Sequence, residues 1–171
     1  MPHLLPMPGE IAQPGASTRW LTTFLNVPLN EIIGCTVGEI AEIEEFAGRS
    51  LPLAYRQWLL EAGKRIGSGS VSDHFQRSHL LYPDMFEVRD IAEEVVLECQ
   101  ADVSLLDRAF PFFNWEVYRL CLLDLSQSLE DPPVLGLNEH TGNANLWYRS
   151  FSQFIGWEIF VLADALAIRN E

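Results

Sequence analysis

The sequence has few cysteines. Cys35, Cys99 and Cys121 are too scattered for a disulfide framework, and an odd number fits a reducing compartment. Cys35 and Cys121 have apolar neighbours, so we interpret both as inert buried thiols. The first residues contain no cationic segment ahead of an apolar one, which argues against a signal peptide. These absences favour a cytoplasmic protein.

Positive charge is also scarce. The 171 residues contain 11 Lys and Arg against 24 Asp and Glu, a formal net charge of −13. A field of this sign repels phosphate backbones and anionic membranes, so neither nucleic acid nor a membrane is expected as a partner. The charge favours a basic protein partner, although high acidity also serves solubility alone.

Long uninterrupted apolar runs are missing as well. Residues 153–168 are mostly apolar, but Glu158 and Asp164 interrupt them. The run falls short of the ~18–20 residues that a membrane span needs, so we expect a core helix. We likewise interpret Trp58, Trp147 and Trp157 as core residues.

Signatures of catalysis, metal binding and cofactor binding are absent. His74 and His79 are five residues apart, which is not the spacing of H-E-x-x-H, and we interpret them as surface or loop histidines. No serine lies in G-x-S-x-G, and the glycines of residues 67–69 lack the P-loop pattern. The sequence therefore predicts no enzyme, no metal and no cofactor.

The clearest local signals lie between Thr36 and Gly63. Thr36 and Glu39 form a capping box that starts one helix, and Gly48 ends it. Pro52 suits the first position of a second helix, which Gly63 ends. Both helices are amphipathic, so we expect a helical hairpin that buries its apolar side on the rest of the domain.

A third helix is predicted from Glu87 to about Gln100, with an apolar stripe on one side. Its opposite face carries carboxylates spaced mostly three and four residues apart, with only Arg89 nearby to offset them. A solvated face is one interpretation, and a patch that meets a basic partner is the other. The candidate partner-binding residues are Glu87, Asp90, Glu93, Glu94 and Glu98.

The remaining pattern indicates an α+β fold with a small, mainly antiparallel sheet. Residues 1–16 are expected to be a flexible Pro-rich leader, residues 17–171 a single domain, and residues 17–26 a short helix. The Gly- and Ser-rich segment from Lys64 to Phe75 is expected to be a flexible loop. Short strands are predicted at 111–115, 117–125, 133–137 and 145–150.

Two blocks of the sequence resemble the SUKH superfamily, which includes yeast cell-wall regulators and many bacterial proteins. The first block reads E-I-x-E-x-E followed by G-R-x-L-P-x-x-Y-R-x-W-L-L-x-x-G. Its residues are Glu39, Ile40, Glu42, Glu44, Gly48, Arg49, Leu51, Pro52, Tyr55, Arg56, Trp58, Leu59, Leu60 and Gly63. The second block comprises Asp131, Pro132, Pro133, Val134, Phe151, Ser152 and Phe154.

The resemblance implies a sheet with helices packed on one face. It also implies a non-enzymatic immunity protein that neutralises a cognate bacterial toxin by direct contact, with a basic nuclease compatible with the net charge of −13. Two alternatives stay open. One is a cellular regulatory or scaffold protein that uses the same surface, and the other is a small-molecule-binding enzyme with a site assembled from distant residues.

Overall fold

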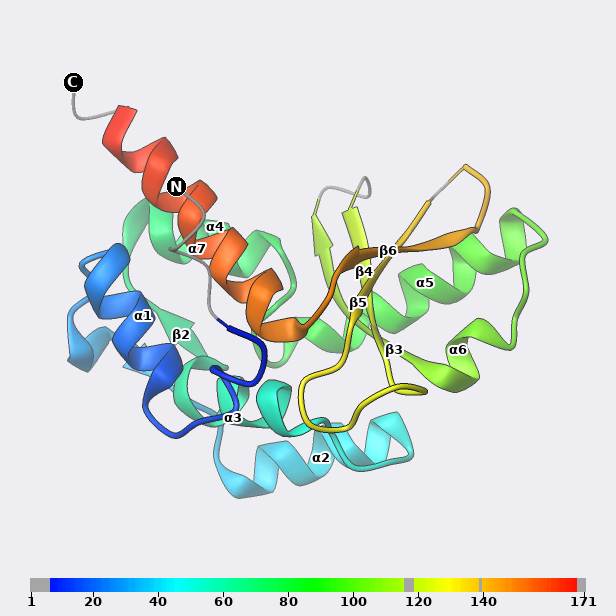
Figure 1. Ribbon diagram of the computed structural model, residues 1–171, viewed down its shortest axis with the longest axis horizontal. Helices are drawn as coiled ribbons and strands as arrows, with labels where there is room; N and C mark the ends of the chain where they lie inside the picture. Colours follow the sequence, from blue (N-terminus) through cyan, green and yellow to red (C-terminus); the bar gives the residue numbers. More distant parts are fainter. Residues whose placement is uncertain (1–6, 116–118, 139, 169–171) are drawn as a thin grey trace.

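The computed structural model describes residues 7–115, 119–138 and 140–168 (Figure 1). The helices are α1 (Ala16–Phe24), α2 (Val37–Ala47), α3 (Leu53–Ala62), α4 (Gly69–Arg77), α5 (Glu87–Glu98), α6 (Leu105–Arg108) and α7 (Phe151–Ile168), with short 3-10 turns at Leu29–Glu31 and Asp84–Phe86. The strands are β1 (Ile32–Ile33), β2 (Arg65–Ile66), β3 (Ala109–Trp115), β4 (Arg119–Asp124), β5 (Val134–Leu137) and β6 (Ala144–Tyr148).

The predicted helical hairpin is confirmed as α2 and α3. The Thr36 hydroxyl accepts a hydrogen bond from the Glu39 backbone N–H at 3.3 Å, and the Glu39 carboxylate accepts one from the Thr36 backbone N–H at 2.8 Å. Gly48 ends α2 with φ 67°, a conformation that glycine adopts without steric cost. Pro52 precedes α3 as its N-cap, one position earlier than expected.

The α+β class and the antiparallel sheet are confirmed. The four larger strands lie in the order β3-β4-β5-β6, so each pairs with its neighbour in the sequence. All three pairings are antiparallel, and register shifts interrupt the β3–β4 and β5–β6 ladders. Strands β1 and β2 form a separate two-stranded pair.

Helices lie on both faces of the larger sheet, whereas the resemblance implied one face (Figure 1). The reason is visible in β4, where every residue from Leu120 to Leu123 is buried and apolar. Leu120 and Leu122 pack with α5, while Cys121 and Leu123 belong to the core beneath α3 and α7. A strand that is apolar on both faces has to be covered on both.

Aromatic rings fill the core between the hairpin, the sheet and α7. The Tyr55 ring lies 5.6 Å from Phe112 and 5.3 Å from Phe151, and Phe112 lies 5.1 Å from Phe154, all edge to face. These four side chains are fully buried. Edge-to-face pairs contribute about 0.5–1.5 kcal/mol each beyond burial, so they fix how α7 sits on the sheet.

The described part of the expected leader, residues 7–16, is folded against the domain. Ile11 is fully buried, and its backbone N–H donates to the Ser152 hydroxyl at 3.1 Å. Glu10 accepts a hydrogen bond from the Trp20 indole at 2.9 Å. The expected helix at residues 17–26 is present as α1, and the Glu61 carboxylate of α3 accepts a backbone N–H from its first turn.

The expectation of a flexible loop from Lys64 to Phe75 is wrong. This segment forms β2 and most of α4, which continues to Arg77. Phe75 explains the difference, because its ring is buried 6.1 Å from Trp58 and anchors α4 to the hairpin. The prediction of a loop was based on the glycines and serines of this segment and did not take account of the burial of Phe75.

Helix α7 begins two residues earlier than expected and is long and apolar enough to cross a membrane by length and composition alone. Its N-terminal half lies in the domain core, as in the core helix that we expected. Its C-terminal half leaves large apolar side chains in solvent. Trp58 is buried as predicted, but Trp147 and Trp157 are 42% and 41% exposed, so their assignment to the core is wrong.

Candidate protein-interaction surface

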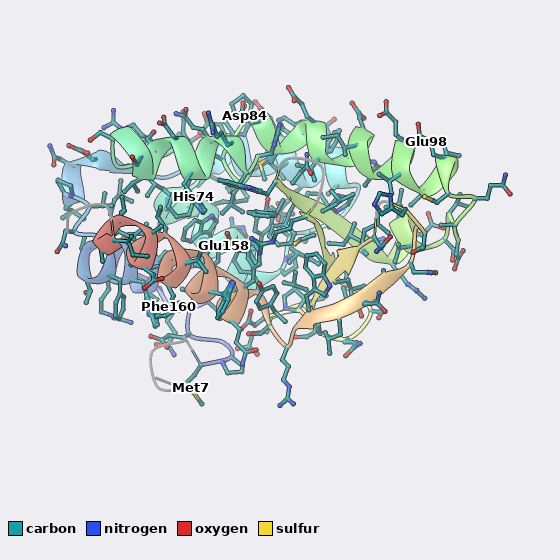
Figure 2. The ribbon with its side chains drawn as sticks, turned by 90° about the horizontal axis from the view of Figure 1, so that it is seen from above. Met7, His74, Asp84, Glu98, Glu158 and Phe160 are labelled. Carbon is teal, nitrogen blue, oxygen red and sulfur yellow. The ribbon has the colours of Figure 1, made fainter. Side chains whose placement is uncertain are left out.

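The predicted acidic face lies on the outer side of α5 (Figure 2). The apolar stripe of α5 packs on the sheet through Val88, Ala92 and Val95, which turns the opposite side to solvent. Because α5 makes just over three turns, its carboxylates form one continuous strip along the helix. The structure thus brings the five candidates together: Glu87, Asp90, Glu93, Glu94 and Glu98.

Two of the five carboxylates have a cationic or titratable neighbour. Glu93 pairs with Arg89 at 2.9 Å, an i,i+4 contact on the helix surface. A carboxylate oxygen of Glu87 lies 3.6 Å from His79 Nε2. Both contacts are solvent-exposed, and such pairs contribute little to stability.

The other three carboxylates, Asp90, Glu94 and Glu98, are exposed and have no ion pair within the part of the chain that the structure describes. They follow one another at i, i+4 and i+8, so they line one edge of the helix. Like charges at this spacing cost a few tenths of a kcal/mol per pair. The free protein therefore keeps a mild electrostatic penalty that a cationic partner would relieve.

An exposed leucine lies at the C-terminal end of this strip and was missed by the sequence analysis. Leu97 is 68% exposed and lies three residues after Glu94 and one before Glu98. It falls outside the apolar stripe of α5, and this departure from the helical period was the signal that could have found it. We call Asp90, Glu93, Glu94, Leu97 and Glu98 the α5 patch. An apolar residue ringed by charges is the arrangement found in protein interfaces.

A buried ionic cluster lies elsewhere, between α4, α7 and β4 (Figure 2). Glu158 is 1% exposed, and one of its carboxylate oxygens accepts a hydrogen bond from Arg119 at 2.6 Å. Its other oxygen lies 3.4 Å from His74 Nε2. The Arg119 guanidinium also lies over the Phe113 ring, 5.4 Å from its centroid.

The cluster corrects the expectation for His74. His74 is neither a surface nor a loop residue, since it lies in α4, its ring centroid is 4.7 Å from that of Trp115 and its Nε2 atom is buried. Glu158, which interrupts the apolar run of the last helix, is the buried centre of the cluster. Burial lowers the pKa of Arg119, but the Glu158 carboxylate outweighs this effect, and the net pKa is raised. The cluster thus joins α7 to β4 as a charged pair.

The cysteine assignments agree with the structure. Cys35 and Cys121 are buried, and burial raises the pKa of Cys35 to about 12 and that of Cys121 further still. Both thiols stay protonated near neutral pH, where a thiol is a poor nucleophile. Within the described residues, no three His, Cys, Asp or Glu side chains are grouped to hold a metal ion.

The hollows of the described surface are small. Two of them have volumes of about 290 and 190 Å³. The larger lies between α4 and α7 beside His74 and Trp115, and the other lies between Arg49, Arg89 and β3. Drug-sized ligands occupy cavities of about 300–1,000 Å³, so the larger hollow is at the lower limit of this range and the other is below it.

Comparison with known families assigns the domain. The sequence model of the SMI1/KNR4 family (SUKH-1) matches residues 34–157. The chain belongs to this family. A search of curated proteins returned no match. The family match includes α2 to α6, β2, the four-stranded sheet and the first turns of α7, and it leaves α1, β1 and most of α7 outside.

The SUKH-1 assignment confirms the resemblance drawn from the hairpin, and the structure gives several of its residues a role. Tyr55 and Trp58 of the L-P-x-x-Y-R-x-W block are fully buried in the core. Asp131 of the second block accepts hydrogen bonds from the backbone N–H groups of Ser152 and Gly9. It therefore caps the start of α7 and holds the N-terminal segment against it.

Proposed function

We propose that this SUKH-1 protein is a cytoplasmic, non-enzymatic binding module that neutralises a cognate bacterial toxin by direct contact, and that the toxin surface it covers is basic, as on a nuclease. Membership of the family supports a protein-binding role. The observation that carries the proposal is the α5 patch, in which Asp90, Glu94 and Glu98 are exposed and unpaired within the described residues around Leu97.

The physical argument has two parts. Lys and Arg on a partner would pair with the three unpaired carboxylates and relieve their mutual repulsion. Leu97 would add an apolar contact that loses water when the surfaces meet. A net charge of −13 also steers a basic partner to the protein and repels acidic competitors. The α5 patch would provide the affinity, and the net negative charge of the whole protein would raise the association rate.

The test begins with the partner. The C-terminal domain encoded by the gene beside this one is co-expressed with the protein and recovered by pull-down. The affinity of the purified pair is then measured for the wild type and for Glu94→Lys/Glu98→Lys. We expect the double variant to bind at least about tenfold more weakly, because each reversed charge both removes an attraction and adds a repulsion.

A matched control separates the patch from net charge. Glu45→Lys/Glu130→Lys changes two other exposed carboxylates and shifts the net charge by the same +4. Both variants are compared at about 0.01 M and 0.15 M salt, where the Debye length is about 30 Å and 8 Å. The patch variant should lose affinity and salt dependence, and the control should keep most of both. Equal losses in the two variants would remove the patch from the proposal.

A further inference from the structure

The hollow of about 190 Å³ beside β3 concentrates positive charge in an acidic protein. Arg49 and Arg89, two of the 11 Lys and Arg residues, line it, whereas Asp107 is the one lining residue among the 24 Asp and Glu. Its apolar side includes Phe110 and Pro111 of β3, which are buried. Apolar surroundings weaken the screening of nearby charges, so the two guanidinium groups attract an anion more strongly here than on an open surface. We call this site the arginine hollow.

Both arginines of the hollow are held in place and still have unused donors. Arg49 donates from Nη2 to the Asp107 backbone carbonyl oxygen at 2.6 Å, and no carboxylate pairs with it within the described residues. Arg89 donates from Nε to the Glu93 carboxylate at 2.9 Å and from Nη1 to the Phe46 carbonyl oxygen at 3.3 Å. A guanidinium group has five N–H donors, so each arginine keeps several for a ligand. Because both side chains are already ordered, binding an anion costs little further side-chain entropy.

The size and charge of the arginine hollow restrict its ligand. Drug-sized ligands occupy about 300 Å³ or more, so a hollow of about 190 Å³ suits a single group of a larger molecule. Carboxylate and phosphate groups are the ones that arginine binds through paired hydrogen bonds. The lining side chains carry two positive charges and one negative charge, and the whole chain carries −13, which favours a ligand group with one negative charge over a group with two. A carboxylate meets these conditions.

We propose that the arginine hollow binds the carboxylate of an Asp or Glu side chain on the protein partner, an inference that rests on the proposed function. Glu93, which pairs with Arg89, belongs to the α5 patch, so one partner surface can cover both sites. The partner then has basic side chains against the patch and one acidic side chain in the hollow. The rest of this acidic protein repels that side chain, so it fits in one place and fixes the register of the complex. The arginine hollow thus distinguishes the cognate partner from other basic proteins.

Arg65 provides a matched control for Arg49. It is exposed, and its Nη2 atom donates to the Asn30 backbone carbonyl oxygen at 3.2 Å, with no carboxylate paired to it within the described part of the chain. It does not line the arginine hollow. Arg49→Gln and Arg65→Gln therefore each remove one positive charge and one hydrogen bond to a carbonyl group, but only Arg49→Gln changes the hollow.

Titration with sodium acetate tests the hollow without a partner. Acetate replaces chloride at constant ionic strength up to about 0.2 M, and the arginine Nε–Hε signals are followed by proton–nitrogen NMR. We expect the Arg49 and Arg89 signals to shift along a saturating curve with a dissociation constant of about 10–100 mM, and the Arg65 signal to stay in place. Arg49→Gln should abolish the shift at Arg89, and Arg65→Gln should preserve it. Equal shifts at Arg49 and Arg65, a response that does not saturate, or tighter binding of inorganic phosphate than of acetate would overturn the proposal.

Affinity for the partner tests where the carboxylate comes from. The binding partner is the C-terminal domain encoded by the neighbouring gene, as in the test of the proposed function. If that partner were basic throughout, removing a positive charge from this protein would leave its affinity unchanged or raise it. We expect the opposite sign: Arg49→Gln should weaken the complex at least about fivefold, because a charge-assisted hydrogen bond is lost, and Arg65→Gln should not.

The outcomes separate this inference from the proposed function. If Glu94→Lys/Glu98→Lys loses affinity while Arg49→Gln binds as tightly as the wild type, the role of the hollow is refuted and the proposed function stands. If the wild type binds no partner, the proposed function fails and the partner side chain falls with it. In that case the acetate titration still decides whether the arginine hollow binds a carboxylate.

Discussion

The buried pair of Arg119 and Glu158 predicts an unequal response to the loss of either partner. Glu158 is 1% exposed, whereas the Arg119 side chain is 31% exposed. Arg119→Met leaves a carboxylate inside the protein without its cation, and removing one partner of a buried pair costs about 3–5 kcal/mol. Glu158→Gln leaves a guanidinium that water still reaches. Its cost is that of a charged hydrogen bond, about 1.5–3 kcal/mol.

Urea unfolding at neutral pH measures both changes by linear extrapolation. We expect Arg119→Met to be the more destabilising by about 2 kcal/mol, the difference between the midpoints of those two ranges. Part of the loss comes from the contact between Arg119 and Phe113, 5.4 Å from the ring centroid, which adds about 0.5–2 kcal/mol in the same direction. Arg119→Lys serves as a control, because it keeps the charge and should retain part of the stability.

The double variant Arg119→Met/Glu158→Gln isolates the charge. It removes the buried carboxylate along with its partner, so it should be less destabilising than Arg119→Met alone. Our reasoning is refuted if Glu158→Gln proves as costly as Arg119→Met, or if the costs of the two single changes simply add.

Three further predictions follow from local geometry. Thr36→Ala removes half of the α2 capping box and should lower the free energy of unfolding by about 1 kcal/mol, measured in urea. Gly34→Ala should lower the free energy of unfolding by more, at least about 3 kcal/mol. The reason is that the added Cβ would lie 1.7 Å from the Leu60 carbonyl oxygen, a backbone atom that cannot move aside. A loss of less than about 1 kcal/mol would contradict this packing. Burial raises the pKa of Cys35 from 9.0 to about 12, so the stability that the protonated thiol contributes is complete below pH 9 and lost as the pH rises toward 12. Cys35→Ala should flatten the fall in urea midpoint between pH 9 and 11, and an unchanged slope would count against this.

The sequence correctly predicted the features that depend on residues close together in the chain. The capping box at Thr36 and the glycine at 48 placed α2 to the residue, since the partners of each cap lie within four positions. The period of α5 likewise fixed which side faces the sheet. In both cases the information lies within one or two turns of chain.

Sequence patterns over one or two helical turns could not predict contacts between residues that are far apart in the chain. Glu158 lies 39 residues from Arg119 and pairs with it only after the sheet and α7 have assembled. Phe75 converts a glycine- and serine-rich segment into a helix because Trp58, from a different helix, offers a surface to bury it. The two-faced burial of β4 could have been read from its unbroken run of apolar residues, which is typical of a strand covered on both sides.

The sequence predicted the carboxylates of the α5 patch, but it did not predict which of them form ion pairs or that Leu97 is exposed beside them. Periodicity put Asp90, Glu94 and Glu98 on one side, and the structure adds that they lack ion pairs within the described residues and that Leu97 stands among them. Those two facts depend on where Arg89 and its neighbours point, which the sequence does not state.

One measurement tests the central claim most directly. Cells that produce the C-terminal domain encoded by the neighbouring gene, which the proposed function expects to be toxic, are supplied with the wild-type protein, with Glu94→Lys/Glu98→Lys, or with Glu45→Lys/Glu130→Lys, at matched levels of folded protein. We predict that the wild type and the Glu45/Glu130 variant restore growth and that the Glu94/Glu98 variant does not. Full rescue by the Glu94/Glu98 variant, or no rescue by the wild type, would contradict the account.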